Sequence, residues 1–248
     1  MNMQISGLRA IAAASLLLLT ASASHAVVLD WSTAPAWSGT SNSYNVDGVA
    51  GNDISVAYTN TNATFVSPYP QITTINTPAA TDLVFRVNPM GTLTTDNITV
   101  TITFIGAYAG GVITSFTLND VDSDTGFTDQ INVSALRGAT PVTVTLGNSG
   151  GTSVNQIFNS PGTGPYAVGL SPTASNPNGD VNVSAGTLAN PVTSITFVWS
   201  NPSTNRTTQT IGLGNITFVP EVASSSAALS LCGGLLAFRR RRSQRAAA

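Results

Sequence analysis

Between Val27 and Phe218, apolar and polar residues alternate with a period of two, and turn-forming Gly, Pro, Asn and Ser recur at short intervals. Alternation of this kind is typical of β-strands with one buried face. No window in this segment has the 3.6-residue apolar period of an amphipathic helix. The pattern therefore predicts an all-β domain, an antiparallel β-sandwich of jelly-roll type, over residues 27–218.

The alternation predicts twelve strands separated by short turns. They are expected at Ile54–Thr59, Ala63–Val66, Gln71–Ile75, Asp82–Val87, Ile98–Ile105, Val112–Val121, Gln130–Leu136, Val142–Leu146, Ser153–Phe158, Asp180–Ala185, Val192–Trp199 and Thr208–Phe218. The stretches 147–151 and 159–179 are rich in Gly, Pro, Ser and Asn and are expected to form long surface loops. Loops at the ends of a sandwich often carry binding function.

Strand parity also predicts the core. Its expected members share faces within their strands and are Phe116, Leu118, Ile131, Val133, Ile195, Phe197 and Trp199. If 112–121 and 130–136 form a hairpin, Leu118 lies opposite Ile131 and Asp120 lies opposite Asp129. Two carboxylates that face each other across a ladder destabilise it unless a positive charge lies between them.

The N-terminus predicts export. Arg9 provides a positive charge, Ile11–Leu19 an apolar stretch, and Ser24-His25-Ala26 a small-residue cleavage site. The apolar stretch is too short for a membrane span, so residues 1–26 are expected to be a helical signal peptide that signal peptidase removes after Ala26.

The C-terminal residues 219–248 predict a second targeting signal. Pro220 and Glu221 precede an apolar span over 222–238, which four arginines follow: Arg239, Arg240, Arg241 and Arg242. A span of this length is at the lower limit for a membrane helix, and the arginines should remain cytoplasmic. The tail is either a simple membrane anchor or a sorting signal that is cut and removed.

Val219-Pro220-Glu221, the Ser/Ala/Leu/Gly-rich span and the Arg cluster resemble the PEP-CTERM sorting signal of Gram-negative bacteria, with Val222 where that family has a second proline. The resemblance covers residues 219–242 alone. It implies transient anchoring in the inner membrane, cleavage by an exosortase-type enzyme, and a final place at the cell surface or in an exopolysaccharide or biofilm matrix.

Composition excludes several functions. Residues 27–218 contain ten Asp, three Arg and no Glu, Lys, His or Cys. This segment therefore cannot form a Ser-His-Asp or Cys-His nucleophile, a His/Cys metal site, a Lys Schiff base or a disulfide. The excess of negative charge argues against nucleic acid as a partner.

One acidic motif is a candidate site: Asp120, Asp122 and Asp124, with Asp129 five residues later. Hard oxygen ligands without His or Cys favour calcium, although neither the spacing nor the expected flanking strands match an EF-hand. A solvated acidic turn is the alternative. Asp120 and Asp129 also raise a third possibility, an acid/base pair of a polysaccharide-acting hydrolase.

Aromatic side chains are the other candidates, because sugar rings stack on aromatic faces. Those near expected turns or the start of the mature chain are Trp31, Trp37, Tyr44, Tyr58, Tyr69 and Tyr166. The sequence as a whole predicts an exported, C-terminally sorted, non-enzymatic surface or matrix protein with a structural or glycan-binding role.

Overall fold

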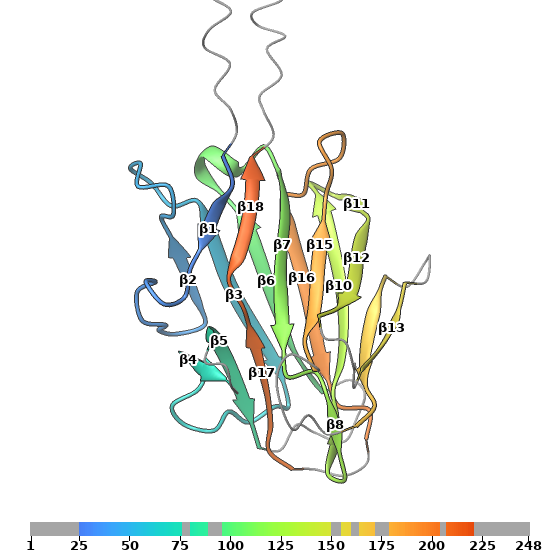
Figure 1. The fold of residues 1–248 in the computed structure, drawn as a ribbon. Helices are drawn as coiled ribbons and strands as arrows, with labels where there is room; N and C mark the ends of the chain where they lie inside the picture. The colour runs from blue at the N-terminus through green and yellow to red at the C-terminus, as the bar shows by residue number, and fades with distance from the viewer. Residues whose placement is uncertain are drawn as a thin grey trace, which may run out of the picture. The chain divides into compact units, whose positions relative to one another are not determined.

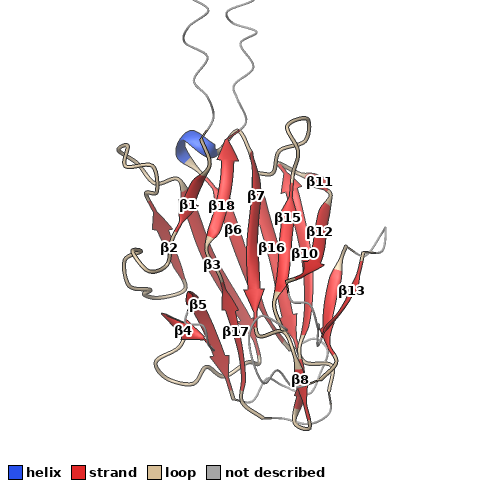
Figure 2. Cartoon of the chain, in the orientation of Figure 1, coloured by secondary structure: helices blue, strands red, loops and turns tan. Residues whose placement is uncertain are grey.

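Two antiparallel β-sheets face each other in the computed structural model, which describes residues 25–75, 80–88, 96–149, 155–159, 164–171, 179–203 and 207–220 (Figure 1). The segment Ala26–Pro220 forms one compact unit. Its architecture is the predicted all-β sandwich of jelly-roll type, and strands account for most of the described chain (Figure 2).

The first sheet is built around β7 (Val112–Asn119), which lies in its middle (Figure 1). One edge of β7 pairs with β15 (Val181–Ala185), which pairs in turn with β12 (Val144–Asn148). The other edge pairs with β18 (Ile216–Pro220) and then β17 (Gln209–Leu213). The sheet is completed by β1 (Val27–Leu29) beside β18, β5 (Ala80–Val87) beside β17, and β4 (Gln71–Ile75) beside β5.

The second sheet has β10 (Gln130–Arg137) and β16 (Ser194–Ser200) at its centre. The order across it is β13 (Asn155–Phe158), β14 (Tyr166–Gly169), β10, β16, β6 (Asn97–Phe104), β3 (Ile54–Thr61) and β2 (Ser41–Tyr44). A further short strand, β11 (Thr140–Val142), pairs with β10. Outside the two sheets lie a small hairpin of β8 (Ser123–Asp124) and β9 (Phe127–Thr128), and the 3-10 helix η2 (Gly106–Tyr108).

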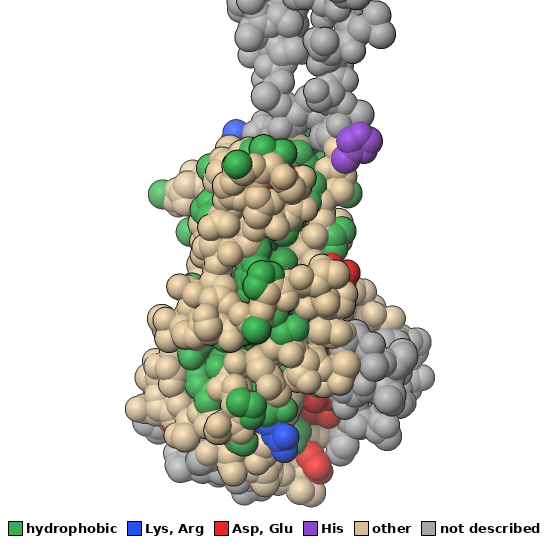
Figure 3. Space-filling model, turned by 90° about the vertical axis from the view of Figure 1, so that its left-hand side faces the viewer, with side chains coloured by type: hydrophobic (Ala, Val, Ile, Leu, Met, Phe, Trp, Pro, Cys, Tyr) green, Lys and Arg blue, Asp and Glu red, His purple; other side chains and the backbone are tan. Residues whose placement is uncertain are grey.

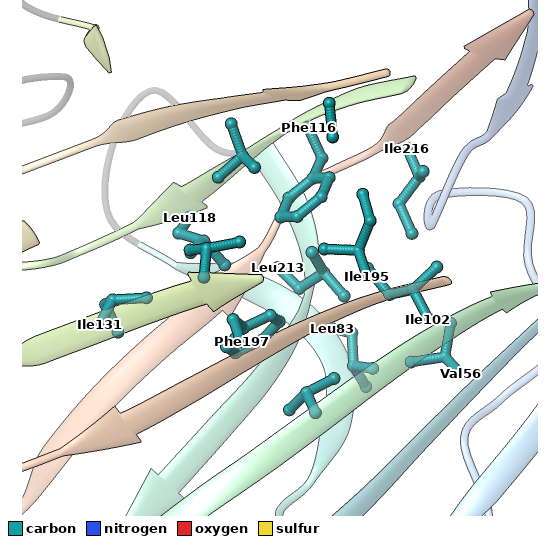
Figure 4. Packing of buried hydrophobic residues seen from close by; sticks show 14 of the residues in the cluster. Val56, Leu83, Ile102, Phe116, Leu118, Ile131, Ile195, Phe197, Leu213 and Ile216 are labelled. Carbon is teal, nitrogen blue, oxygen red and sulfur yellow. The ribbon is translucent and has the colours of Figure 1, made fainter. Parts of the chain in front are cut away.

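The core lies between the sheets, where alternate residues of each strand point inward. In β6, for example, Ile98, Val100, Ile102 and Phe104 are buried while the intervening residues are partly exposed. Figure 4 shows Phe116 and Leu118 of the first sheet packed towards Ile131, Ile195 and Phe197 of the second. All seven predicted core residues are at most 5% exposed, so this prediction is confirmed.

The predicted hairpin between 112–121 and 130–136 is wrong, because β7 and β10 belong to different sheets. Leu118 pairs with Val181 and Leu213, whereas Ile131 pairs with Trp199 and Ala167. Parity could not distinguish the two arrangements. Strands paired in a hairpin and strands facing each other across a core both place their apolar residues on one shared side.

Several short or polar strands escaped prediction. β2 reads Ser-Asn-Ser-Tyr, β1 has three residues, and β14 lies inside the expected loop 159–179. The expected strand Thr208–Phe218 is divided into β17 and β18 at Gly214-Asn215. The two expected terminal helices lie outside the described residues. Within the described ranges, no helix is long and apolar enough to cross a membrane.

Candidate functional site

The four predicted acidic residues lie on the connection between β7 and β10, where the chain crosses from one sheet to the other. Asp129 is fully buried and Asp122 is 7% exposed, whereas Asp120 is partly exposed and Asp124 is exposed beside the turn of the β8–β9 hairpin. The backbone of Asp120 has a φ of 69°, which turns the chain sharply after β7. The predicted pairing of Asp120 opposite Asp129 on a ladder is therefore absent from this connection.

Asp129 anchors this connection to the second sheet. Its Oδ1 accepts a 2.7 Å hydrogen bond from Nε1 of Trp199, and its Oδ2 accepts one of 3.3 Å from the backbone N–H of Asp122. Its backbone carbonyl accepts a further bond from Gly169. Burial raises the pKa of Asp129 well above its usual range, and the negative charges of Asp122 and Asp120 add to the rise.

These contacts decide what the acidic residues can do. Asp129 is 0% exposed and its carboxylate is engaged, so it cannot reach a polysaccharide as the acid or base of a hydrolase. In the part of the chain that the structure describes, no group of three or more His, Cys, Asp or Glu side chains is arranged to hold a metal ion. Calcium binding by Asp120, Asp122, Asp124 and Asp129 stays a prediction.

A separate polar pocket of about 490 Å³ opens on the outer face of the first sheet. Thr117 and Asn119 of β7 reach it because they alternate with the core residues Phe116 and Leu118. The residues that line it are carboxylic acids, amides, hydroxyls and one glycine: Asp30, Ser32, Thr81, Asp82, Thr117, Asn119, Ser149, Asp180, Gly214 and Asn215. No Lys or Arg is among these described residues, and their side chains make the wall rich in oxygen atoms.

The pocket contains a buried carboxylate–amide pair. Nδ2 of Asn119 donates a 2.7 Å hydrogen bond to Oδ2 of Asp82, although their strands, β7 and β5, are separated by β17. Gly212 of β17 pairs with Asn119 on one side and with Val84 on the other. A Cβ atom on Gly212 would lie 2.5 Å from Oδ2 of Asp82, so the missing side chain makes room for this bond.

The carboxyl groups of the pocket differ in their acidity. Hydrogen bonds from Ser32 lower the pKa of Asp30. Burial raises the pKa of Asp82, and burial raises that of Asp180 to about 6, with added repulsion from Asp82 and Asp120. A hydrogen bond from the backbone of Asp120 opposes the rise at Asp180. The pocket thus offers strong acceptors beside groups that can also donate, a combination suited to hydroxyl-rich ligands.

The aromatic candidates divide into core residues and surface residues. Trp31 is 1% exposed and its Nε1 donates to the carbonyl of Gly214, and Tyr44 packs edge-on against it. The ring centroids of Trp37 and Tyr58 are 6.2 Å apart, and both residues are partly buried. The ring of Tyr166 stacks on Phe158 at a centroid distance of 4.5 Å and an interplanar angle of 13°. Tyr166 and its neighbour Phe158 thus form a pair of stacked rings on the outer face of the second sheet.

Comparison with known proteins gives likenesses of architecture only. No family model and no curated protein matches the chain. A carbohydrate-binding module described for specific mannan recognition is 14% identical, with a TM-score of 0.32, over 66% of this chain and 88% of that one. A xylan-binding module is 8% identical, with a TM-score of 0.31, over 80% and 97%.

A family 11 carbohydrate-binding module from Clostridium thermocellum, in complex with a mixed-linked tetrasaccharide, is 10% identical, with a TM-score of 0.29, over 80% of this chain and 98% of that one. What these modules bind is a property of those modules, and identities and scores of this size compare the all-β architecture alone.

The pocket was not predicted from the sequence. Its central residues come from strands that are far apart in sequence, and only Asp82 carried a signal, as an acidic residue at the start of the apolar run Leu83-Val84-Phe85. A carboxylate in a buried strand needs a hydrogen-bond partner, and here the partner is 37 residues away in sequence.

Proposed function

We propose that this protein is a non-enzymatic glycan-binding protein and that its ligand occupies the pocket on the outer face of the first sheet. The observation that supports this proposal is the pocket itself, a polar hollow of about 490 Å³ in which none of the described lining residues is cationic. Sugar hydroxyls donate to carboxylates and accept from amides and hydroxyls, and the accessible lining residues Asp30, Asn215 and Thr117 supply these groups together.

The location of the protein is part of the proposal. We infer export through the signal peptide and C-terminal sorting through the PEP-CTERM-like tail, with signal peptidase and an exosortase-type enzyme as processing partners. A matrix rich in polysaccharide would then surround the folded body, and a calcium ion at the acidic connection would stabilise it.

The hydrolase reading has little support. The predicted acid/base pair, Asp120 and Asp129, cannot act on a polysaccharide because Asp129 is fully buried. Asp180, with a pKa of about 6, is the group in the pocket best suited to exchange a proton. An assay for glycan cleavage is therefore the right control for every binding experiment.

Two matched variants of the full-length protein test the proposal. Thr117→Val removes a hydroxyl that lines the pocket, and Thr145→Val makes the same change at an exposed position of β12 in the same sheet that does not line it. Binding to neutral oligosaccharides is measured by isothermal titration calorimetry. We expect Thr117→Val to weaken binding about fivefold, which corresponds to the loss of about one hydrogen bond to the ligand. Thr145→Val should bind with the affinity of the wild type. Equal oligosaccharide affinities of the two variants would show that the pocket is not the glycan-binding site.

A further inference from the structure

The outer face of the second sheet carries no charge. Every residue that points outward from β3, β6, β16, β10, β14 and β13 is uncharged, and most are Ser, Thr, Asn or Gln. The body has ten Asp and three Arg, so a face of six strands without any of them is a distinct surface. Figure 3 shows another side of the molecule, turned by 90° from the view of Figure 1, where charged side chains are present but few.

The register of the sheet aligns six of these outward residues in one row across the strands. Each is paired directly with the next, in the order Thr59, Thr99, Val198, Asn132, Tyr166 and Phe158. Neighbouring strands are about 4.8 Å apart, so the row spans about 24 Å. The spacing between neighbouring strands is close to the length of one pyranose unit in an extended polysaccharide. One sugar can therefore lie over each strand.

The row has the two kinds of group that a sugar chain contacts. Thr59, Thr99 and Asn132 present hydroxyl and amide groups, and the stacked rings of Tyr166 and Phe158 form a rigid apolar wall at one end. In the next row, the hydroxyls of Thr101 and Thr196 lie 3.3 Å apart across β6 and β16, which holds the surface groups in place. A sugar ring offers C–H groups on its faces and hydroxyls around its edge, and the row complements both.

We propose that this face is a second glycan-binding surface, on which an extended, uncharged polysaccharide chain lies across the strands from Thr59 to Phe158. The inference rests on the proposed function and extends it, because the pocket belongs to the other sheet. With one site on each outer face of the sandwich, a single protein links two glycan chains. A second copy of the protein is a poorer occupant, since the core of a stable protein interface is more apolar than this Ser/Thr-rich face.

The test uses full-length protein and neutral β-1,4-linked hexasaccharides of glucose, xylose and mannose. Tyr166→Ala removes the ring wall, Asn132→Lys places a bulky charge in the middle of the row, and Thr145→Lys is a charge control on the other sheet. Calorimetry gives affinity and the number of sites, and melting temperature reports folding. If Asn132→Lys does not fold, Tyr166→Ala carries the test.

We expect wild-type protein to bind two hexasaccharides. Tyr166→Ala and Asn132→Lys should each weaken one of these events at least about tenfold, while Thr145→Lys changes neither and Thr117→Val affects only the other. Unchanged binding by both row variants, with weaker binding by Thr117→Val, would overturn the second surface and leave the proposed function standing. An absence of binding by the wild type to all three hexasaccharides would overturn both. If Asn132→Lys converts a dimer to a monomer without changing glycan affinity, the face is a protein interface and the inference is wrong.

Discussion

Replacing Asp129 by Asn tests the account of the connection between the sheets. The substitution keeps the size of the side chain, but the carboxyl group, which is protonated at pH 4, has two oxygens that can accept a hydrogen bond, and the amide of Asn has one. Trp199 and the backbone of Asp122 both donate to Asp129, so one of these donors loses its acceptor in the variant. An unsatisfied buried donor costs about 1–3 kcal/mol, which is the loss of stability that we expect at pH 4.

The difference between the two proteins should shrink as pH rises. The pKa of Asp129 is raised in the folded protein, so its contribution to stability is fully present below the unfolded pKa and is lost as pH rises towards the folded pKa. In this window the titration of Asp129 therefore lowers the stability of the wild type by up to about 1.4 kcal/mol per pH unit, and this contribution is missing from the variant. Asp82 and Asp180 titrate in both proteins, so their effects cancel in the difference.

Urea unfolding at several pH values between 4 and 8 measures this difference directly. Both proteins are followed by the fluorescence of their tryptophans, and the free energies of unfolding are compared at each pH. A difference that stays constant over the whole range would show that Asp129 has no raised pKa, and the buried-carboxyl account would be wrong.

Three further predictions concern the core, the acidic connection and the tail. Leu118→Ala should cost about 2–5 kcal/mol in urea unfolding, because Leu118 is 0% exposed between the sheets; a loss below about 0.5 kcal/mol would contradict its place in the core. Millimolar calcium should raise the melting temperature relative to chelator, by the equivalent of about 2.7 kcal/mol at a hundredfold excess over Kd, and Asp120→Asn with Asp124→Asn should remove the effect; identical curves at fixed ionic strength would leave only a solvated turn. Intact-mass analysis of the exported protein should show a chain without Arg239–Arg242, and a stable full-length form in the inner membrane would mean a plain anchor.

Fold class and core were predictable because they depend on local alternation. The alternation within a single strand is enough to identify its buried face, as it does for Phe116 and Leu118 and for Phe197 and Trp199. Pairing was harder to predict, because parity is the same for strands joined in a hairpin and strands that face each other across a core. The positive φ of Asp120 and the small β8–β9 hairpin, which send the chain to the other sheet, leave no trace in the hydrophobic pattern.

The candidate sites depend on contacts between residues far apart in sequence. The acidic motif was visible as a cluster, but the carboxyl group of Asp129 is hydrogen-bonded to Trp199, 70 residues later. The pocket needs Asp82, Asn119 and a bare Gly212 on three neighbouring strands, and the row on the second sheet needs the register of six. Neither arrangement can be derived from spacing along the chain.

Whether the protein binds glycan without cutting it can be decided in a single incubation. Full-length protein is mixed with neutral polysaccharides, and bound protein and newly formed reducing ends are measured in the same samples. We expect the protein to be retained on at least one polysaccharide with no increase in reducing ends. New reducing ends that disappear in a folded Asp180→Asn variant would contradict it and make the pocket an active site.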